Sequence, residues 1–198
     1  MKKDRSEKYE EFLDAAISLI EEKGFDNTSV SQIVQRAGLA QGTFYLYFSS
    51  KAALAPAIAE RIVEDAMARG EKKKLNQAEN SKDFLRGLIE LVFEITEDYQ
   101  QIITFLYSGM SYYHSLEKWE AIYDPYYQWL EKIFEQFQKK GELRKKPDTT
   151  IMVQFTLGIL EQSAETCYLF KRNNGDVDKI KKDLLEFILK GFEENTTA

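Results

Sequence analysis

The spacing of apolar residues constrains this chain more than any other feature of its sequence. Apolar side chains recur every three or four positions, as in Val30, Ile33 and Val34, and runs that alternate apolar with polar residues are absent. This period places apolar residues on one face of an α-helix, whereas a half-buried strand requires alternation. We therefore predict an all-α fold with about nine helices. They are expected near residues 5–23, 30–37, 41–48, 52–69, 84–95, 99–113, 116–140, 149–170 and 177–193.

Glycines and polar runs mark the ends of several predicted helices. Gly24 and Gly38 follow the last apolar position of the first two helices, as helix-ending glycines do. Ser29 and Gln32 have the spacing of a capping box at the start of the second helix. The polar segment 71–80 is the clearest connector in the chain. We expect a small helical domain at 1–50, a connecting helix at 51–70 and a larger helical body at 71–198.

The composition argues against several classes of protein. The chain holds one histidine and one cysteine, His114 and Cys167, which are too few for a typical zinc site or a histidine-based catalytic set. We therefore expect no enzymatic activity, no metal and no cofactor. No apolar run reaches the roughly 18 residues of a membrane span, and the charged N-terminus lacks the apolar core of a signal peptide. We expect a cytoplasmic protein that does not contact membranes.

The distribution of acidic residues singles out one segment. The net charge is −6, and 33 of the 198 residues are acidic, yet none lies between Asn27 and Ala59. A surface that approaches DNA avoids carboxylates, because the phosphates repel them. The same segment contains two short predicted helices joined by a tight turn at Gly38, which is the pattern of a helix-turn-helix. A helical hairpin that merely lacks acidic residues is the alternative interpretation.

At these residues the sequence resembles the TetR family of bacterial transcriptional repressors. The resemblance runs from Phe12 to Leu54, and the spacing from Ser29 to Lys51 fits without a gap. It implies an N-terminal DNA-binding domain, a helical ligand-binding body and a dimer that binds a pseudo-palindromic operator. The residues that carry it are Gly24-Phe25, Thr28-Ser29-Val30, Ile33, Ala37-Gly38-Leu39, Gly42-Thr43-Phe44-Tyr45, Tyr47-Phe48 and Lys51.

The resemblance also implies roles for individual residues. Two positions depart from the family pattern: Ala40 stands where a serine often caps the helix, and Gln41 stands where lysine or arginine is frequent. Gln41 can pair with adenine but cannot hold guanine as arginine does. Thr28 and Ser29 are implied to contact phosphates of the DNA backbone. Gln41, Gly42 and Thr43 are implied to lie close to the bases. Tyr45, Tyr47 and Lys51 are implied to hold phosphates.

Aromatic residues concentrate in the C-terminal body. Twelve of them, including both tryptophans, lie between Tyr99 and Phe137. Because buried tyrosines and tryptophans need partners for their polar tips, we expect a cavity for a bulky hydrophobic ligand, with ordinary core packing as the alternative. Glu161 and Glu165, one helical turn apart, either face this cavity and select cationic ligands or lie on a solvated edge. The expected ligand-binding residues are Phe105, Trp119, Tyr123, Tyr126, Tyr127, Glu161 and Glu165.

The last two predicted helices indicate self-association. Residues 177–193 carry two adjacent apolar stripes, which is more apolar surface than one partner within the chain can cover. The resemblance implies that helices 149–170 and 177–193 pair with their copies in a homodimer. We therefore predict a ligand-responsive transcriptional repressor that binds a double-stranded DNA operator and is released by a small hydrophobic effector. An architectural DNA-binding protein without an effector is the alternative.

Overall fold

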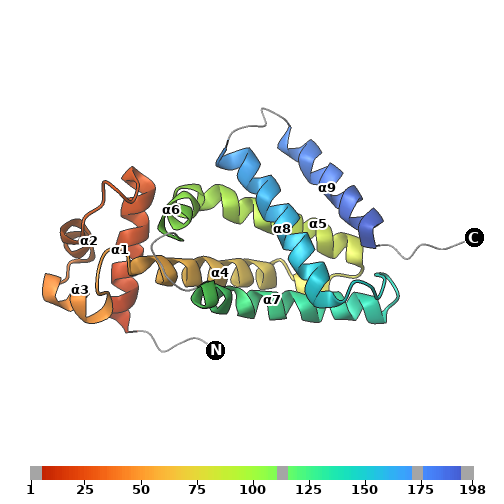
Figure 1. Ribbon diagram of the computed structural model, residues 1–198, viewed down its shortest axis with the longest axis horizontal. Coiled ribbons are helices and arrows are strands. Elements are labelled where there is room, and N and C mark those ends of the chain that lie inside the picture. Colours follow the sequence, from red (N-terminus) through yellow and green to blue (C-terminus); the bar gives the residue numbers. More distant parts are fainter. Residues whose placement is uncertain (1–5, 111–115, 171–175, 193–198) are drawn as a thin grey trace, which may run out of the picture. The chain divides into compact units, whose positions relative to one another are not determined.

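The computed structural model confirms the all-α prediction (Figure 1). It describes residues 6–110, 116–170 and 176–192, although the side chains of 108–110 and 116–119 lie outside the description. Within these residues the regular elements are nine α-helices and one short 3-10 helix, η1. Their bounds are α1 Glu7–Lys23, α2 Val30–Ala37, α3 Gln41–Tyr47, α4 Leu54–Lys72, η1 Leu75–Gln77, α5 Ser81–Asp98, α6 Gln100–Met110, α7 Leu116–Lys139, α8 Thr149–Tyr168 and α9 Val177–Phe192.

Contacts divide the helices into two compact units. One consists of Met1–Ile62 and Tyr99–Ile122, and the other of Val63–Asp98 and Tyr123–Ala198. The N-terminal unit therefore includes α6, which contacts α1, in addition to the helices of the predicted DNA-binding domain. The sequence-based division at residues 50 and 70 assigned α6 to the C-terminal body, because helical periodicity does not reveal which helices pack together.

The ends of the first three helices follow the expected local chemistry. The Ser6 side chain accepts a hydrogen bond from the Tyr9 amide at the start of α1. The predicted capping box is present at Ser29 and Gln32, and Gly38 ends α2 in the left-handed conformation with a φ of 68°. The first turn of α3 has no side-chain cap, as the alanine at its N-cap position predicts. Packing must therefore hold α3 in place.

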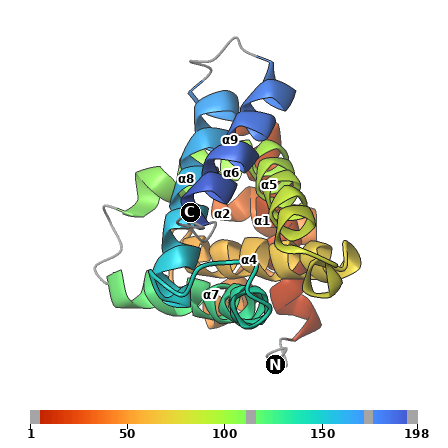
Figure 2. The ribbon, with the colours of Figure 1, turned by 90° about the vertical axis from the view of Figure 1, so that its right-hand side faces the viewer.

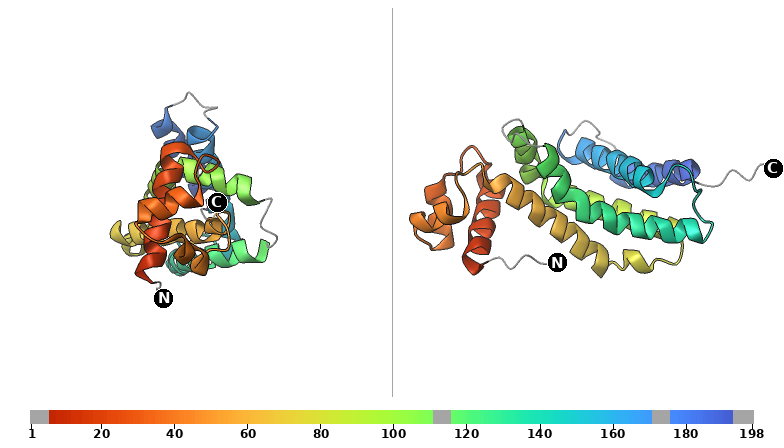
Figure 3. Two further views of the ribbon diagram at one scale, coloured as in Figure 1. Left: turned by 90° about the vertical axis from the view of Figure 1, so that its left-hand side faces the viewer. Right: turned by 60° about the horizontal axis from the view of Figure 1, so that its bottom comes forward.

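The core of the N-terminal unit supplies that packing. Phe44 of α3 is fully buried, and its ring meets the ring of Phe12 of α1 edge to face at 5.4 Å between centroids. Phe48, directly after α3, stacks on Tyr9 at 5.1 Å. Figure 3 shows α1, α2 and α3 gathered together at the start of the chain. These contacts fix the orientation of α3 from one side and leave its other side exposed.

The C-terminal unit is organised around α5. This helix buries one apolar side, including Phe84, Leu88 and Val92, and it packs against α8 and α9, which lie side by side (Figure 2). The predicted connector at 71–80 is more ordered than expected, because α4 continues to Lys72 and Leu75 of η1 is buried. The Leu75 side chain lies where a side chain at Gly87 of α5 would stand. No helix in the described ranges has the length and apolar character needed to span a membrane.

Candidate functional site

The outer face of α3 is exposed and carries most of the expected DNA-reading residues. Gln41 and Gly42 are exposed at the start of the helix, and Tyr45 and Tyr47 are exposed further along it. Leu46 lies between these tyrosines and is 81% exposed. This arrangement agrees with the predicted recognition helix, and the individual contacts with DNA remain predictions.

The Tyr47 hydroxyl has a partner within the protein. It accepts a hydrogen bond of 2.8 Å from the Ser6 hydroxyl, the same side chain that caps α1. The ring of Tyr47 meets that of Tyr9 edge to face at 6.1 Å. Tyr47 therefore links the end of α3 to the start of α1, and its hydroxyl proton stays available for a phosphate oxygen.

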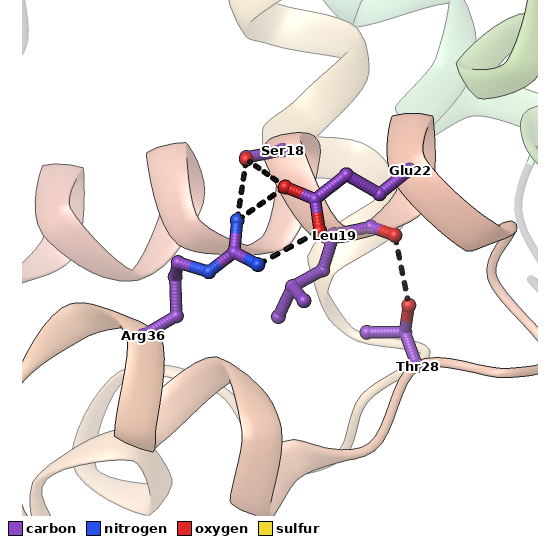
Figure 4. Close-up of polar contacts among 5 residues, drawn as sticks. All are labelled: Ser18, Leu19, Glu22, Thr28 and Arg36. Atoms are coloured by element: carbon purple, nitrogen blue, oxygen red, sulfur yellow. Dashed lines mark hydrogen bonds and ion pairs between the residues drawn. The ribbon is translucent and has the colours of Figure 1, made fainter.

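Thr28 has a different role from the one that the resemblance implies. It is 2% exposed, and its hydroxyl lies 2.9 Å from the Gly24 carbonyl oxygen. The same hydroxyl lies 3.3 Å from the Leu19 carbonyl oxygen (Figure 4). A hydroxyl that donates to protein carbonyls in the interior does not fit a direct contact with a phosphate. Thr28 instead joins the loop before α2 to the end of α1. The neighbouring Ser29 is exposed and keeps its predicted position at the surface.

Arg36 lies in the last turn of α2, directly before the recognition helix, but its charge is already paired. Its guanidinium forms a two-pronged ion pair with Glu22 of α1, at 2.6 and 2.8 Å, and also donates to the Ser18 hydroxyl (Figure 4). The hydrogen bonds from Arg36 lower the pKa of the Glu22 carboxyl. Because this pair is exposed, its main effect is to orient α2 against α1.

Lys51 braces the loop that precedes α2. Its ammonium donates to the carbonyl oxygens of Phe25 at 2.8 Å and Thr28 at 2.7 Å. The same nitrogen lies 4.0 Å from the centre of the Phe25 ring, within the range of a cation–π contact. Burial lowers the pKa of the ammonium. The contact between Lys51 and a phosphate stays a prediction, and the structure adds a loop-bracing role that the sequence did not indicate.

Phe105 lies on the other side of the Phe25 ring. The two rings are stacked with 3.8 Å between centroids and 19° between planes, and Phe105 is buried. Phe25 is therefore held between an ammonium group and an aromatic ring. Phe105 was predicted to line a ligand cavity, but its observed contact is with the loop that leads into the helix-turn-helix. Sequence reasoning missed Phe25, which showed no signal beyond its place in the family motif.

Most of the other expected ligand-binding residues come together in the C-terminal unit. Tyr123, Tyr126 and Tyr127 lie on α7 and Glu161 and Glu165 lie on α8, and the negative charge of Glu161 contributes to the raised pKa of both Tyr123 and Tyr126. Burial is the larger cause of both shifts. The side chain of Trp119 lies outside the described residues. The side chain of Glu161 is half-buried, and its place at a ligand cavity stays a prediction.

The pKa of Glu161 is raised to about 7. The main cause is burial, which disfavours the charged form, and the second is the negative charge of Glu165. On α7, the ring of Trp129 lies against that of Tyr126 with 5.9 Å between centroids and 16° between planes. Tyr126 and Trp129 therefore stack on each other within α7, and a ligand site at these residues stays a prediction.

Comparison with known proteins identifies the family. Residues 12–58 match the family described as bacterial regulatory proteins, tetR family, and residues 85–192 match the family described as Tetracyclin repressor-like, C-terminal domain. The chain belongs to the tetR family. It is therefore a transcriptional regulator with a helix-turn-helix and not an enzyme.

Relatives extend over nearly the whole length of this tetR-family regulator. It is 43% identical over 188 residues to the uncharacterized HTH-type transcriptional regulator YvdT of Bacillus subtilis, covering 95% of this chain and 96% of the relative. It is 25% identical to the fatty acid metabolism regulator protein of the same organism, covering 96% and 97%. The fold also resembles that of FadR from B. subtilis in complex with stearoyl-CoA, with a TM-score of 0.75, 23% identity and 92% and 98% coverage.

Gly42 offers a clean test of how closely the recognition helix of this tetR-family regulator approaches DNA. A Cβ atom at Gly42 would meet nothing within 4 Å in the free protein. Alanine also favours helix by about 1 kcal/mol over glycine, so Gly42→Ala should not reduce the free energy of unfolding. We expect it to weaken operator binding about tenfold or more, because the added methyl group meets the DNA. Unchanged affinity in a fluorescence anisotropy titration would place Gly42 away from the bases.

Proposed function

We propose that the protein is a repressor that binds a pseudo-palindromic operator as a homodimer and leaves it when a bulky hydrophobic effector occupies the C-terminal unit. The observation that supports this proposal is that one chain joins an exposed helix α3 to a second unit rich in aromatic residues. An exposed recognition helix lies in the N-terminal unit, and the predicted aromatic and acidic cluster lies in the other. A purely architectural DNA-binding protein would not need a ligand-binding site in its C-terminal unit.

Two exposed phenylalanines support dimer formation through α8 and α9. Phe155 of α8 is 56% exposed and Phe187 of α9 is 65% exposed. A side chain added at Gly158 or Gly191 would meet nothing within 4 Å, so the two helices also present open positions without side chains, where another backbone can approach. These helices therefore combine exposed apolar side chains with exposed glycines. A surface that packs against a second copy of the chain has this composition.

The similarity to regulators of fatty acid metabolism supports a hydrophobic effector. One structure with this fold was solved with stearoyl-CoA, which joins a long acyl chain to a polar nucleotide-containing group. The aromatic faces of the C-terminal unit suit a ligand with a large apolar part in the same way. We therefore include long-chain acyl-CoA thioesters among the candidate effectors, beside hydrophobic dyes and cations.

The effector proposal can be tested through intrinsic fluorescence. Trp119 and Trp129 are the two tryptophans of the chain, and Trp129 stacks directly on Tyr126. We expect a ligand that occupies the cluster to quench tryptophan emission at the same concentrations at which it releases labelled operator DNA. Stearoyl-CoA, a hydrophobic dye and a lipophilic cation form the first panel, with coenzyme A as the control that lacks the acyl chain. Quenching without any loss of DNA affinity would contradict the proposal.

A further inference from the structure

The helix α9 directs Lys181 toward the rest of its unit and Phe187 away from it. Lys181 precedes the buried residues Ile188 and Phe192 by about two and about three helical turns, which places all three on one side of the helix. The Lys181 side chain is 17% exposed, whereas Phe187, about 120° around the helix axis, is 65% exposed. A lysine therefore occupies an inward position of α9, where an apolar residue is usual.

The Lys181 ammonium binds to α5. It donates a hydrogen bond of 2.5 Å to Oε2 of Glu90, and it lies 5.4 Å from the centre of the Phe93 ring. Phe93 is fully buried, and its ring meets that of Tyr168 of α8 edge to face at 6.2 Å between centroids. Figure 2 shows α5, α8 and α9 together. Lys181 thus fastens α9 to α5 at a point where α5 also contacts α8.

Apolar packing alone does not determine the rotation of α9 about its axis. Further apolar residues of this helix are only half-buried, and they spread over about half of its circumference. They are Val177, Ile180, Leu184, Leu185 and Leu189. A rotated α9 would therefore bury a different but similarly apolar set of side chains.

An ion pair constrains a helix in a way that apolar contacts do not. Its Coulomb energy is offset by the cost of removing both charges from water, so an apolar side chain of similar size gives about the same stability. The ammonium and the carboxylate must nevertheless meet in one geometry, and the best-attested use of such groups is to fix register. At the other end of α9, the Arg144 amide donates to the Phe192 carbonyl oxygen at 3.0 Å. These two contacts anchor the start and the end of the helix.

We propose that the pair of Lys181 and Glu90 sets the rotation of α9 on α5 and so presents Phe187 to a second copy of the chain. Lys181 is then a positioning residue for dimer formation that contributes little to the stability of the single chain. This inference rests on the proposed function, because it assumes a dimer formed through α8 and α9. A rotation of α9 by one residue step, about 100°, would turn Phe187 away from the partner and remove its contribution to the dimer.

A Lys181→Met variant separates dimer formation from folding, because methionine keeps an unbranched side chain without the charge. We expect the dimer dissociation constant of the full-length protein, measured by sedimentation equilibrium, to rise about tenfold or more as the burial of Phe187 is lost. The free energy of unfolding, measured by urea titration in a Phe187→Glu background that does not dimerise, should stay nearly unchanged. A contact that merely stabilises the fold would instead lower the unfolding free energy.

Three further variants test the assignment to the ion pair. Lys181→Arg should dimerise within about threefold of the wild type, because arginine also pairs with carboxylates and is attracted to aromatic rings. Lys182→Met removes the neighbouring exposed lysine and should behave as the wild type. Glu90→Ala should weaken the dimer as Lys181→Met does, and the double variant should be no weaker, because both substitutions remove the same pair.

The outcomes separate this inference from the proposed function. A dimer that Lys181→Met leaves unchanged, or that Lys181→Arg weakens as much as Lys181→Met, would overturn the positioning role alone and leave the dimeric repressor intact. An unfolding free energy that falls together with the dimer affinity would also overturn the positioning role. A wild-type protein that is monomeric at micromolar concentration would overturn the dimer of the proposed function, and this inference with it.

Discussion

A Phe187→Glu variant should be monomeric at micromolar concentration and should lose operator binding. Phe187 is 65% exposed on α9, so the substitution should leave the fold of the single chain intact. Burying a phenylalanine side chain contributes about 1.5–3 kcal/mol, and twofold symmetry counts each side chain twice. The loss of two such side chains, before any cost of burying the new carboxylates, weakens the dimer roughly 100-fold or more.

The measurement is sedimentation of the variant beside a titration of labelled operator. Lys182→Glu is the matched control, because Lys182 is exposed on the same helix about 140° around its axis from Phe187. We expect the control to remain a dimer with operator affinity close to that of the wild type. A Phe187→Glu variant that remains a dimer would place the interface elsewhere, and a monomer with full operator affinity would show that one DNA-binding domain is sufficient.

Phe105→Ala should damage both stability and DNA binding. The Phe105 ring is buried and stacked on Phe25, and removing it leaves a cavity that costs about 3–5 kcal/mol of unfolding free energy. Phe25 then loses one of the two groups that hold its ring. Because Lys51 and Thr28 are joined to the same loop, the entry to α2 shifts and the recognition helix loses its fixed position. We expect operator affinity to fall about tenfold or more under conditions in which the variant is folded.

A Phe84→Ala variant separates the effect of Phe105→Ala on stability from its effect on DNA binding. Phe84 is also a fully buried phenylalanine, but its ring contacts Phe134 and Phe137 in the C-terminal unit. Its loss should lower the unfolding free energy by a similar amount in a urea titration and leave operator affinity nearly unchanged. Equal operator affinities for the two folded variants would contradict a positioning role for the Phe25–Phe105 stack.

Local sequence patterns predicted the helices well, because their causes are local. The helix α2 begins after the capping box at Ser29 and ends at Gly38, where the chain turns left-handed, and both features are visible in the sequence. The missing cap of α3 was equally visible at Ala40. The extra turn of α4 and the burial of Leu75 were not predicted, because the polar sequence around Leu75 does not show that it meets Gly87.

Side-chain contacts between distant segments were the part that the sequence did not determine. The motif that points to Thr28 as a phosphate contact contains no information about its burial, which depends on where α1 ends. Phe105 was assigned to the ligand site because it lies in the aromatic-rich segment, whereas its partner is Phe25. For Glu161, helical periodicity left two orientations open, and its role in ligand binding stays a prediction.

The central claim is that the chain reads a specific operator as a symmetric dimer, and selection from a library of random DNA duplexes tests it most directly. The purified wild-type protein should enrich an inverted repeat whose half-sites lie about one helical turn, or a multiple of it, apart. Binding to the enriched sequence should weaken steeply with salt, as phosphate contacts require. Enrichment of no sequence, or of a motif without inverted symmetry, would contradict the account and favour an architectural DNA-binding protein.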